Sequence, residues 1–258
     1  QKAKRVGNKI VMPEKLSEIV YGRHPVVEAI KSGWPVDKVV LQQGIRGEFE
    51  KEIRHLTKEY EVPFQVVPKE RLNKLAGGNH QGVVAFISPI PFQRLEDILP
   101  SVFENGQNPL IVLLDGITDV RNFGAIARSA EVFGAHALVI SSKKSAQVNA
   151  EAVKTSAGAL TLIPVCREKS MVGAIELLKL SGVKVYVSDL AATASIAALD
   201  WTIPVALVIG SESEGITPAV AALADDRFLI PQLGQTDSLN ASVAAGIILY
   251  EATRQRHL

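Results

Sequence analysis

Short apolar runs alternate with amphipathic segments along most of this chain. In the second half, runs such as Leu110–Leu114 and Val205–Ile209 are continuously apolar, which is typical of strands buried on both faces. Apolar residues recur at helical spacing in the segments between them. This alternation predicts an α/β fold with a mostly parallel sheet. Expected strands are 110–114, 137–140, 160–165, 184–188, 205–209 and 228–230, and expected helices are 124–133, 150–156, 171–180 and 238–254.

The first third of the chain has the same alternation on a smaller scale. We expect strands at 39–41, 64–67 and 82–87 and helices at 26–32 and 48–60. Prolines then cluster between 89 and 109, which indicates a connecting segment with one short helix at 95–103. The expected organisation is a flexible basic tail at 1–15, a small α/β domain at 16–88, a linker at 89–107 and a second domain at 108–258.

Charge and composition narrow the function classes only slightly. Residues 1–87 carry 15 Lys and Arg against 10 Asp and Glu, whereas residues 88–258 carry 13 against 17. A basic N-terminal part suits a polyanion, although an ordinary solvated surface explains the same charge. The chain has no apolar run long enough for a membrane span, and its basic start is not a secretory signal. The single Cys166 excludes an internal disulfide, so we expect a cytoplasmic protein.

Three polar, glycine-rich blocks carry the candidate chemistry. They are residues 115–134, 210–215 and 230–242, and each follows an apolar run that reads as a buried strand. Open α/β sheets bind ligands at the carboxyl ends of their strands. Three such ends in one domain predict one shared site.

The second block has the glycine spacing of a phosphate-binding loop, Gly210 to Gly215, but Ile216 stands where that loop needs lysine. Glu212 and Glu214 would also repel a phosphate, which excludes a nucleotide triphosphatase. The glycines alone would indicate a tight turn after a strand, but the two carboxylates in this turn make a functional role an equal alternative.

In the first block, Asn122 is either an N-cap or a site residue. Arg128 follows six residues later, about 240° round a helix, so both reach one site only if Asn122 lies in the loop before that helix. In the third block, Asp237 or Ser238 caps the last helix, or Ser238, Asn240 and Ser242 position a polar substrate beside free amides.

Neither a metal-binding spacing nor a Ser/His/Asp arrangement is present in the sequence. The blocks therefore fit a group-transfer enzyme that works by positioning, and fit a binding protein nearly as well.

The three blocks together resemble the signature motifs of the SPOUT superfamily, in particular its SpoU-type RNA ribose 2′-O-methyltransferases. Asn122, Gly124 and Arg128 match the first motif, and Gly210, Glu212 and Gly215 match the second. The third motif is matched by Ile230, Pro231, Ser238, Leu239, Asn240 and Ser242. Residues 20–29 resemble the N-terminal substrate-binding domain of bacterial 23S rRNA guanosine 2′-O-methyltransferases, which has an L30e-like fold.

The resemblance implies a trefoil-knotted C-terminal domain, a homodimer and S-adenosylmethionine as the cofactor, without a metal. It assigns cofactor binding to Gly210, Ile230 and Leu239. It assigns catalysis or substrate positioning to Asn122, Arg128, Glu212, Ser238 and Asn240. The implied partner is structured RNA, with 23S-type rRNA favoured over tRNA. A non-catalytic RNA-binding or ribosome-assembly factor on the same fold is the alternative from another class.

The implied reaction transfers a methyl group to a ribose 2′-oxygen, which is a poor nucleophile until its proton leaves. The family view makes Arg128 the base, but a guanidinium is hardly ever deprotonated. We expect Arg128 to hold an RNA phosphate and stabilise developing negative charge. Ser238, Asn240 or an RNA phosphate then helps to take the proton, and the sequence leaves these alternatives open.

Overall fold

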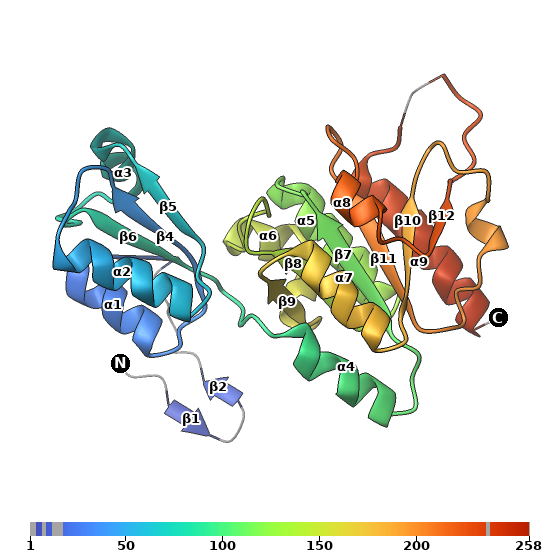
Figure 1. The fold of residues 1–258 in the computed structure, drawn as a ribbon, viewed down its shortest axis with the longest axis horizontal. Coiled ribbons are helices and arrows are strands. Elements are labelled where there is room, and N and C mark those ends of the chain that lie inside the picture. The colour runs from blue at the N-terminus through green and yellow to red at the C-terminus, as the bar shows by residue number, and fades with distance from the viewer. Residues whose placement is uncertain (1–3, 7–8, 12–17, 236–237, 258) are drawn as a thin grey trace. The chain divides into compact units, whose positions relative to one another are not determined.

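The chain forms two compact units, Gln1–Pro91 and Phe92–Leu258 (Figure 1). A computed structural model describes residues 4–6, 9–11, 18–235 and 238–257. The tail expected at 1–15 lies largely outside the described residues, but β1 (Lys4–Val6) and β2 (Lys9–Val11) pair antiparallel within it. None of the described helices is both long and apolar enough to cross a membrane.

The first unit is a four-stranded sheet with helices on both faces. Its strands are β3 (Ile19–Tyr21), β4 (Val36–Gln42), β5 (Phe64–Val67) and β6 (Val83–Ile87), in the order β3-β6-β4-β5. Its helices are α1 (Arg23–Lys31), α2 (Glu48–Glu59) and α3 (Lys69–Leu75). β4 and β5 are parallel, whereas β6 is antiparallel to both of its neighbours.

Alternating side chains of β4 show why both faces need a cover. Val39 and Leu41 are buried in a cluster with α1 and α2, whereas Val40 packs on the other face against Leu72 of α3. Successive residues of a strand point to opposite faces, so the apolar run Val39–Leu41 in β4 must be buried on both. The small α/β domain expected from the sequence is present.

The second unit is a six-stranded, wholly parallel sheet in the order β12-β10-β11-β7-β8-β9. Its strands are β7 (Leu110–Asp115), β8 (Ala137–Ser141), β9 (Val165–Glu168), β10 (Lys184–Ser188), β11 (Val205–Gly210) and β12 (Asp226–Phe228). Its helices are α4 (Leu95–Glu104), α5 (Val120–Val132), α6 (Ala150–Thr155), α7 (Met171–Leu180), α8 (Pro218–Ala221) and α9 (Ala241–His257), with short 3₁₀ turns at Ala159–Thr161 and Ile196–Ala198.

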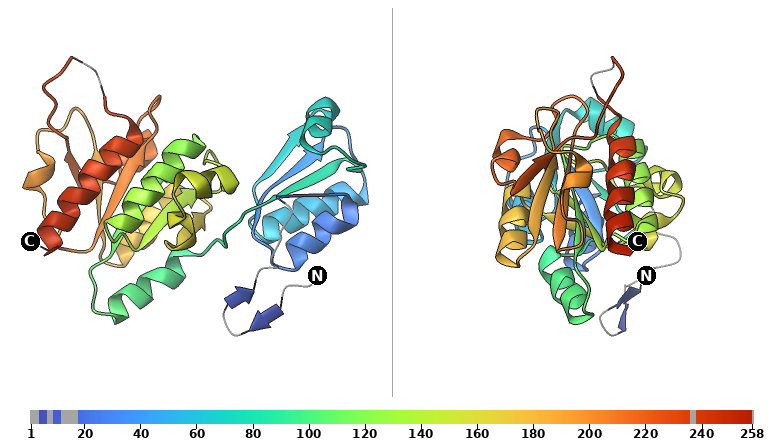
Figure 2. Two further views of the ribbon diagram at one scale, coloured as in Figure 1. Left: turned by 180° about the vertical axis from the view of Figure 1, so that it is seen from behind. Right: turned by 90° about the vertical axis from the view of Figure 1, so that its right-hand side faces the viewer.

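Helices cover both faces of this sheet (Figures 1 and 2). α4, α7 and α8 bury their apolar side chains on one face, and α5 and α9 pack side by side on the other. At the end of α9, the Arg256 guanidinium donates to the backbone oxygens of Trp201, Asn108, Pro109 and Ile203 at 2.7–3.0 Å. These bonds fasten α9 to the segments that lead into β7 and β11.

Two segments differ from the sequence-based expectation. The strand expected at 160–165 is wrong except at its last residue: Ala159–Thr161 forms a 3₁₀ turn, because Gly158 is left-handed and Pro164 lacks a backbone donor, and β9 begins only at Val165. The helix expected at 95–103 is present as α4, but it is part of the second unit rather than of a linker, because its Leu95 and Leu99 are buried there. The Leu95 amide also donates to Glu168 Oε1 at 2.9 Å, which binds α4 to the end of β9.

Candidate active site

The three polar blocks meet at the carboxyl edge of the parallel sheet. Asp115 and Gly210 are paired residues at the ends of β7 and β11, and the third block leads into α9. Glu212 lies at the junction. Its Oε1 accepts hydrogen bonds from Asn122 Nδ2 at 3.0 Å, from the Ala241 amide at 3.4 Å and from Asn240 Nδ2. The structure therefore brings Asn122, Glu212 and Asn240 into one network.

Helix capping fixes the two amides of this network. Asp119 is the N-cap of α5 and accepts from the amides of Arg121 and Asn122, which places Asn122 inside the first turn. Asn240 Oδ1 accepts from the Ser242 amide at 2.9 Å and from Ser242 Oγ at 2.6 Å. Because that oxygen satisfies the start of α9, the Asn240 Nδ2 is directed to Glu212 and to Asn122 Oδ1, 3.1 Å away.

The turn of the second block is held by its own backbone and by β7. Ser211 and Gly215 exchange two backbone hydrogen bonds at 2.9 and 3.0 Å, and Ser211 Oγ accepts from the Glu214 amide at 3.1 Å. Buried Asp115 accepts from the Thr217 amide at 2.7 Å. These contacts fix the backbone from which Glu212 projects.

Gly210 is required here for a reason that the sequence did not reveal. A Cβ on this residue would lie 2.4 Å from the Gly215 carbonyl carbon and 2.5 Å from the Ile216 nitrogen. The protein's own backbone, rather than a ligand alone, therefore excludes a side chain at position 210.

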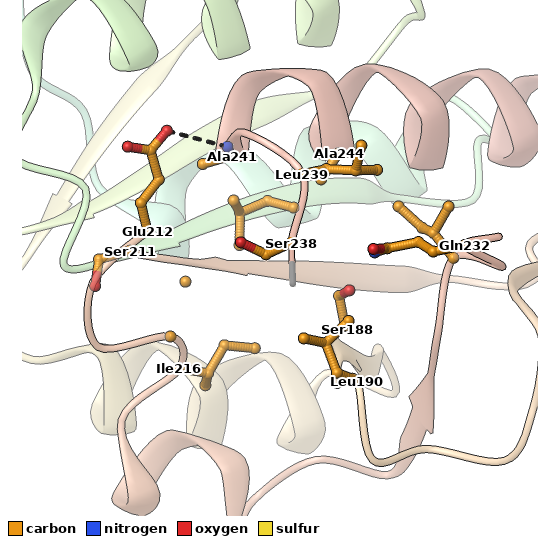
Figure 3. A pocket seen from close by; sticks show the side chains of 14 residues that line it. Ser188, Leu190, Ser211, Glu212, Ile216, Gln232, Ser238, Leu239, Ala241 and Ala244 are labelled. Carbon is orange, nitrogen blue, oxygen red and sulfur yellow. Dashed lines mark hydrogen bonds between the residues drawn. The ribbon is translucent and has the colours of Figure 1, made fainter. Parts of the chain in front are cut away.

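A cavity of about 320 Å³ opens beside this network. Ser211 and Glu212 lie at one end of it and Ser188, Leu190 and Gln232 at the other (Figure 3). The remaining lining residues are Ile209, Gly210, Gly215, Ile216, Ile230, Ser238, Leu239, Ala241 and Ala244. This size and a mainly apolar wall with a few polar groups suit a small organic molecule. The three residues assigned to the cofactor, Gly210, Ile230 and Leu239, all line this cavity.

The two remaining predicted catalytic residues differ in their placement. Ser238 is exposed, lines the cavity and makes no hydrogen bond with other described residues. Arg128 is exposed on α5 and does not line the cavity. The condition set for Arg128, that Asn122 lie in the loop as the cap, is not met, because α5 begins at Val120 and Asp119 caps it. Within one chain Arg128 forms no hydrogen bond with the described residues of the Asn122 network.

Sequence reasoning missed the residues on the far side of the cavity. Ser188 ends β10 and Leu190 follows it, so the rule that placed the other blocks at strand ends applies here too. Asp189 lies between these two residues in the chain. A hydrogen bond from the Ala191 amide and the Arg227 guanidinium, 2.9 Å away, hold the pKa of Asp189 below its usual range. Within the part of the chain that the structure describes, no group of His, Cys, Asp and Glu could hold a metal ion.

Family comparisons agree with this architecture. Residues 109–250 match the SpoU rRNA Methylase family, and residues 19–93 match the family described as RNA 2′-O ribose methyltransferase substrate binding. The chain is 34% identical over 239 residues to a Staphylococcus aureus protein named as a TrmH family tRNA/rRNA methyltransferase, covering 93% of this chain and 96% of that protein. A Bacillus subtilis protein named likewise is 33% identical over 241 residues, with the same coverage.

Solved structures show the same fold. The SpoU methyltransferase AviRb from Streptomyces viridochromogenes, crystallised with S-adenosylmethionine, is 29% identical, with a TM-score of 0.59 over 92% of this chain and 90% of that one. An S-adenosylmethionine-bound rRNA methyltransferase from Sinorhizobium meliloti is 27% identical, with a TM-score of 0.59 over 92% and 86%. A TrmH/SpoU tRNA modifying enzyme from A. aeolicus is 32% identical, with a TM-score of 0.53 over 63% and 84%. The chain therefore belongs to the SpoU (TrmH) family of S-adenosylmethionine-dependent RNA methyltransferases, within the SPOUT superfamily.

Proposed function

We propose that this enzyme methylates a ribose 2′-hydroxyl in large-subunit ribosomal RNA. The observation that carries the proposal is the Asn122–Glu212–Asn240 network beside a cavity lined by Gly210, Ile230 and Leu239. S-adenosylmethionine, which the family uses, supplies the methyl group. The apolar wall of Ile209, Ile216 and Leu239 suits its adenine ring, and the polar groups at each end suit its ribose and amino-acid parts.

The coverage of the comparisons favours rRNA over tRNA as the substrate. The solved rRNA methyltransferase matches 92% of this chain. The solved tRNA modifying enzyme matches only 63%, a share close to that of the second unit alone. The first unit carries the basic balance and matches a substrate-binding family. We infer that this unit selects the RNA.

The network orients groups around the reacting hydroxyl. Glu212 Oε1 is occupied by three donors, whereas Oε2 makes no hydrogen bond with other described residues. Asn240 is fully used as a helix cap and as a donor to Glu212, which makes it a positioning residue rather than a base. Ser238, whose hydroxyl is free among the described residues, is the better candidate to relay the ribose proton to water, because it can accept that proton while releasing its own.

A second copy of the chain is needed to complete this site. α9 exposes Val243, Ile247 and Tyr250 on one face, and at the end of the adjacent α5 Val132 is 65% exposed. Arg128 is four residues before Val132, so it projects from the same face of α5. An apolar surface of this kind rarely stays open to water. A homodimer through α5 and α9 would cover it and carry Arg128 toward the site of the partner subunit.

Two inactive variants test both the reaction and the proposal that Arg128 acts in the site of the partner subunit. Glu212→Ala and Arg128→Ala proteins are assayed separately and after mixing through an unfolding and refolding cycle, with transfer of labelled methyl to unmodified rRNA as the readout. If Arg128 acts across the dimer, the mixed dimers regain one intact site and activity returns. If mixing restores nothing while both variants form dimers, Arg128 acts within its own chain. Wild-type protein that labels no ribose 2′-oxygen contradicts the proposed reaction.

A further inference from the structure

The first unit has a second cavity at one edge of its sheet. β3, β4 and β5 end at this edge and β6 begins there, so four connections converge. The cavity has a volume of about 670 Å³. Its lining residues are Arg23, His24, Gln42, Ile45, Lys69, Gly78, Asn79, His80, Gln81 and Gly82.

The charge of this cavity favours an anion. Arg23 at the start of α1 and Lys69 at the start of α3 line it, and no carboxylate of a described residue does. The lysine-rich cavity of the second unit is different, because Asp115 and Glu214 share it with Lys143, Lys144 and Lys169, and Lys144 pairs with Glu214 at 3.8 Å. Neither cation forms an ion pair with a described residue, although the Arg23 guanidinium lies 4.7 Å from the centre of the Phe49 ring. Two such cations in a concave site are a suitable contact for phosphate.

The turn at 78–82 is held in one conformation. Gln81 has a φ of 49°, and its Oε1 accepts from the Arg23 amide at 3.1 Å. The His80 ring accepts from the Gly82 amide through Nδ1 at 3.0 Å, so its Nε2 donates to Asn73 Oδ1 at 2.7 Å. Gly82 has a φ of +82°, in the left-handed region that favours glycine, and a Cβ there would also collide with Ile45 Cδ1. Such a fixed wall lowers the entropic cost of binding.

Several polar groups that could hydrogen-bond to a nucleotide base line this cavity and have no partner among the described residues. The side-chain amides of Gln42 and Asn79 and the amide nitrogen of Gln81 make no hydrogen bond with other described residues. At the rim, Gly78 lies against the ring of Tyr21, which is 43% exposed. Amide side chains can hydrogen-bond the edges of an unstacked base, and an exposed aromatic ring can stack on it.

We propose that this cavity binds an unpaired nucleotide of the substrate RNA, with its phosphate at Arg23 and Lys69 and its base at the amides of Asn79 and Gln81. The proposal rests on the proposed function, that the substrate is RNA. It adds that the first unit recognises a loop or bulge, because bases within a duplex cannot present their pairing edges to these amides.

Binding of short RNAs to the full-length protein tests this assignment. The probes are fluorescein-labelled 12-nucleotide oligoadenylate and oligouridylate and a 12-base-pair RNA duplex, measured by anisotropy at several salt concentrations. Lys69→Ala and Asn79→Ala change exposed side chains and are expected to preserve the fold. Each should weaken binding to the single strands about tenfold, because each removes a hydrogen-bonding group that the nucleotide would use. Lys69→Ala should also reduce the log–log salt slope by about 0.7.

Lys74→Ala is the matched control, because Lys74 is an exposed lysine of the same helix that does not line the cavity. It should change binding less than twofold. Equal losses of RNA affinity from Lys69→Ala and Lys74→Ala would contradict the assignment of this cavity as a nucleotide site. Tighter binding of the duplex than of the single strands would contradict it too, as would more effective competition by polyglutamate than by RNA. If wild-type protein methylates RNA while Lys69→Ala and Asn79→Ala bind normally, only this proposal fails. If wild-type protein neither binds nor methylates RNA, the proposed function fails with it.

Discussion

The Asn122 side-chain amide donates a hydrogen bond to Glu212 Oε1 at 3.0 Å, across 90 residues of sequence. This bond joins the first turn of α5 to the turn after β11, and Asn240 at the start of α9 donates to the same oxygen. One carboxylate oxygen thus fixes the relative positions of all three polar blocks.

The contributions of Asn122 and Glu212 to activity and stability should depend on each other, because the two side chains share a hydrogen bond. We expect Asn122→Ala and Glu212→Gln each to reduce methyl transfer, and their effects on the free energy of unfolding to be non-additive by about 0.5–3 kcal/mol, as for residues in one hydrogen-bond network. A double-mutant cycle by urea unfolding measures this coupling. Additive effects would mean that the two side chains do not interact in solution.

Arg128→Ala should lower turnover far more than it lowers affinity for S-adenosylmethionine. Arg128 does not line the cavity, and removing an electrostatic partner of developing charge typically costs about a hundredfold or more in rate. Arg121→Ala is the control, since Arg121 is an exposed arginine of the same helix paired with Glu151. Calorimetry and single-turnover kinetics separate the two quantities. Equal losses of affinity and rate would make Arg128 a cofactor ligand.

Gly210→Ala should remove cofactor binding and also destabilise the second unit. The added Cβ would meet the Gly215 backbone at 2.4 Å, so the turn that carries Glu212 must move. Gly234→Ala in the third block is the control, because its Cβ would meet nothing within 4 Å. Thermal unfolding and calorimetry on both variants test this, and an alanine at 210 that binds cofactor normally would show that the turn adapts.

Residues 92–258 should fold and bind cofactor without the first unit, since α4 packs within the second unit. They should bind RNA much more weakly, because residues 88–258 carry 13 Lys and Arg against 17 Asp and Glu. For every phosphate that the truncated protein no longer neutralises, the log–log salt dependence should flatten by about 0.7–0.9. Filter binding across a salt series measures this. A truncated protein that keeps the affinity and the slope would place RNA recognition in the second unit.

Acid should destabilise the second unit through His136. Burial and the nearby Arg256 hold the pKa of His136 below 6.5, and its Nδ1 accepts from the Leu110 amide at 3.0 Å. The folded state therefore disfavours the proton, so the stabilisation is present above the unfolded pKa of about 6.5 and is lost as the pH falls below it. His136→Asn retains an acceptor without this titration. Urea unfolding at pH 7.5 and 5.5 should show that the free energy of unfolding falls less for the variant than for the wild-type protein. An equal fall in both proteins would assign the effect to other groups.

The sequence pattern predicted the parallel sheet and the meeting of the three polar blocks at one of its edges, because buried strands and strand-end glycines are local signals. It did not predict that Asp119 caps α5 rather than Asn122, since Asp and Asn are both good caps and the two residues are only three positions apart. It also missed Ser188 and Leu190, whose roles depend on β10 lying beside β11. The pairing of two strands that are distant in the sequence cannot be deduced from the spacing of residues along the chain. The trefoil knot stays a prediction from the family.

The most direct test of the central claim is mass-spectrometric mapping of 2′-O-methyl groups in rRNA and tRNA from cells that have or lack this protein. We predict that one ribose methylation in large-subunit rRNA disappears without the protein. It should return with the wild-type chain but not with Arg128→Ala, while the tRNA pattern stays unchanged. An unchanged rRNA pattern, or a loss confined to tRNA, would contradict this account.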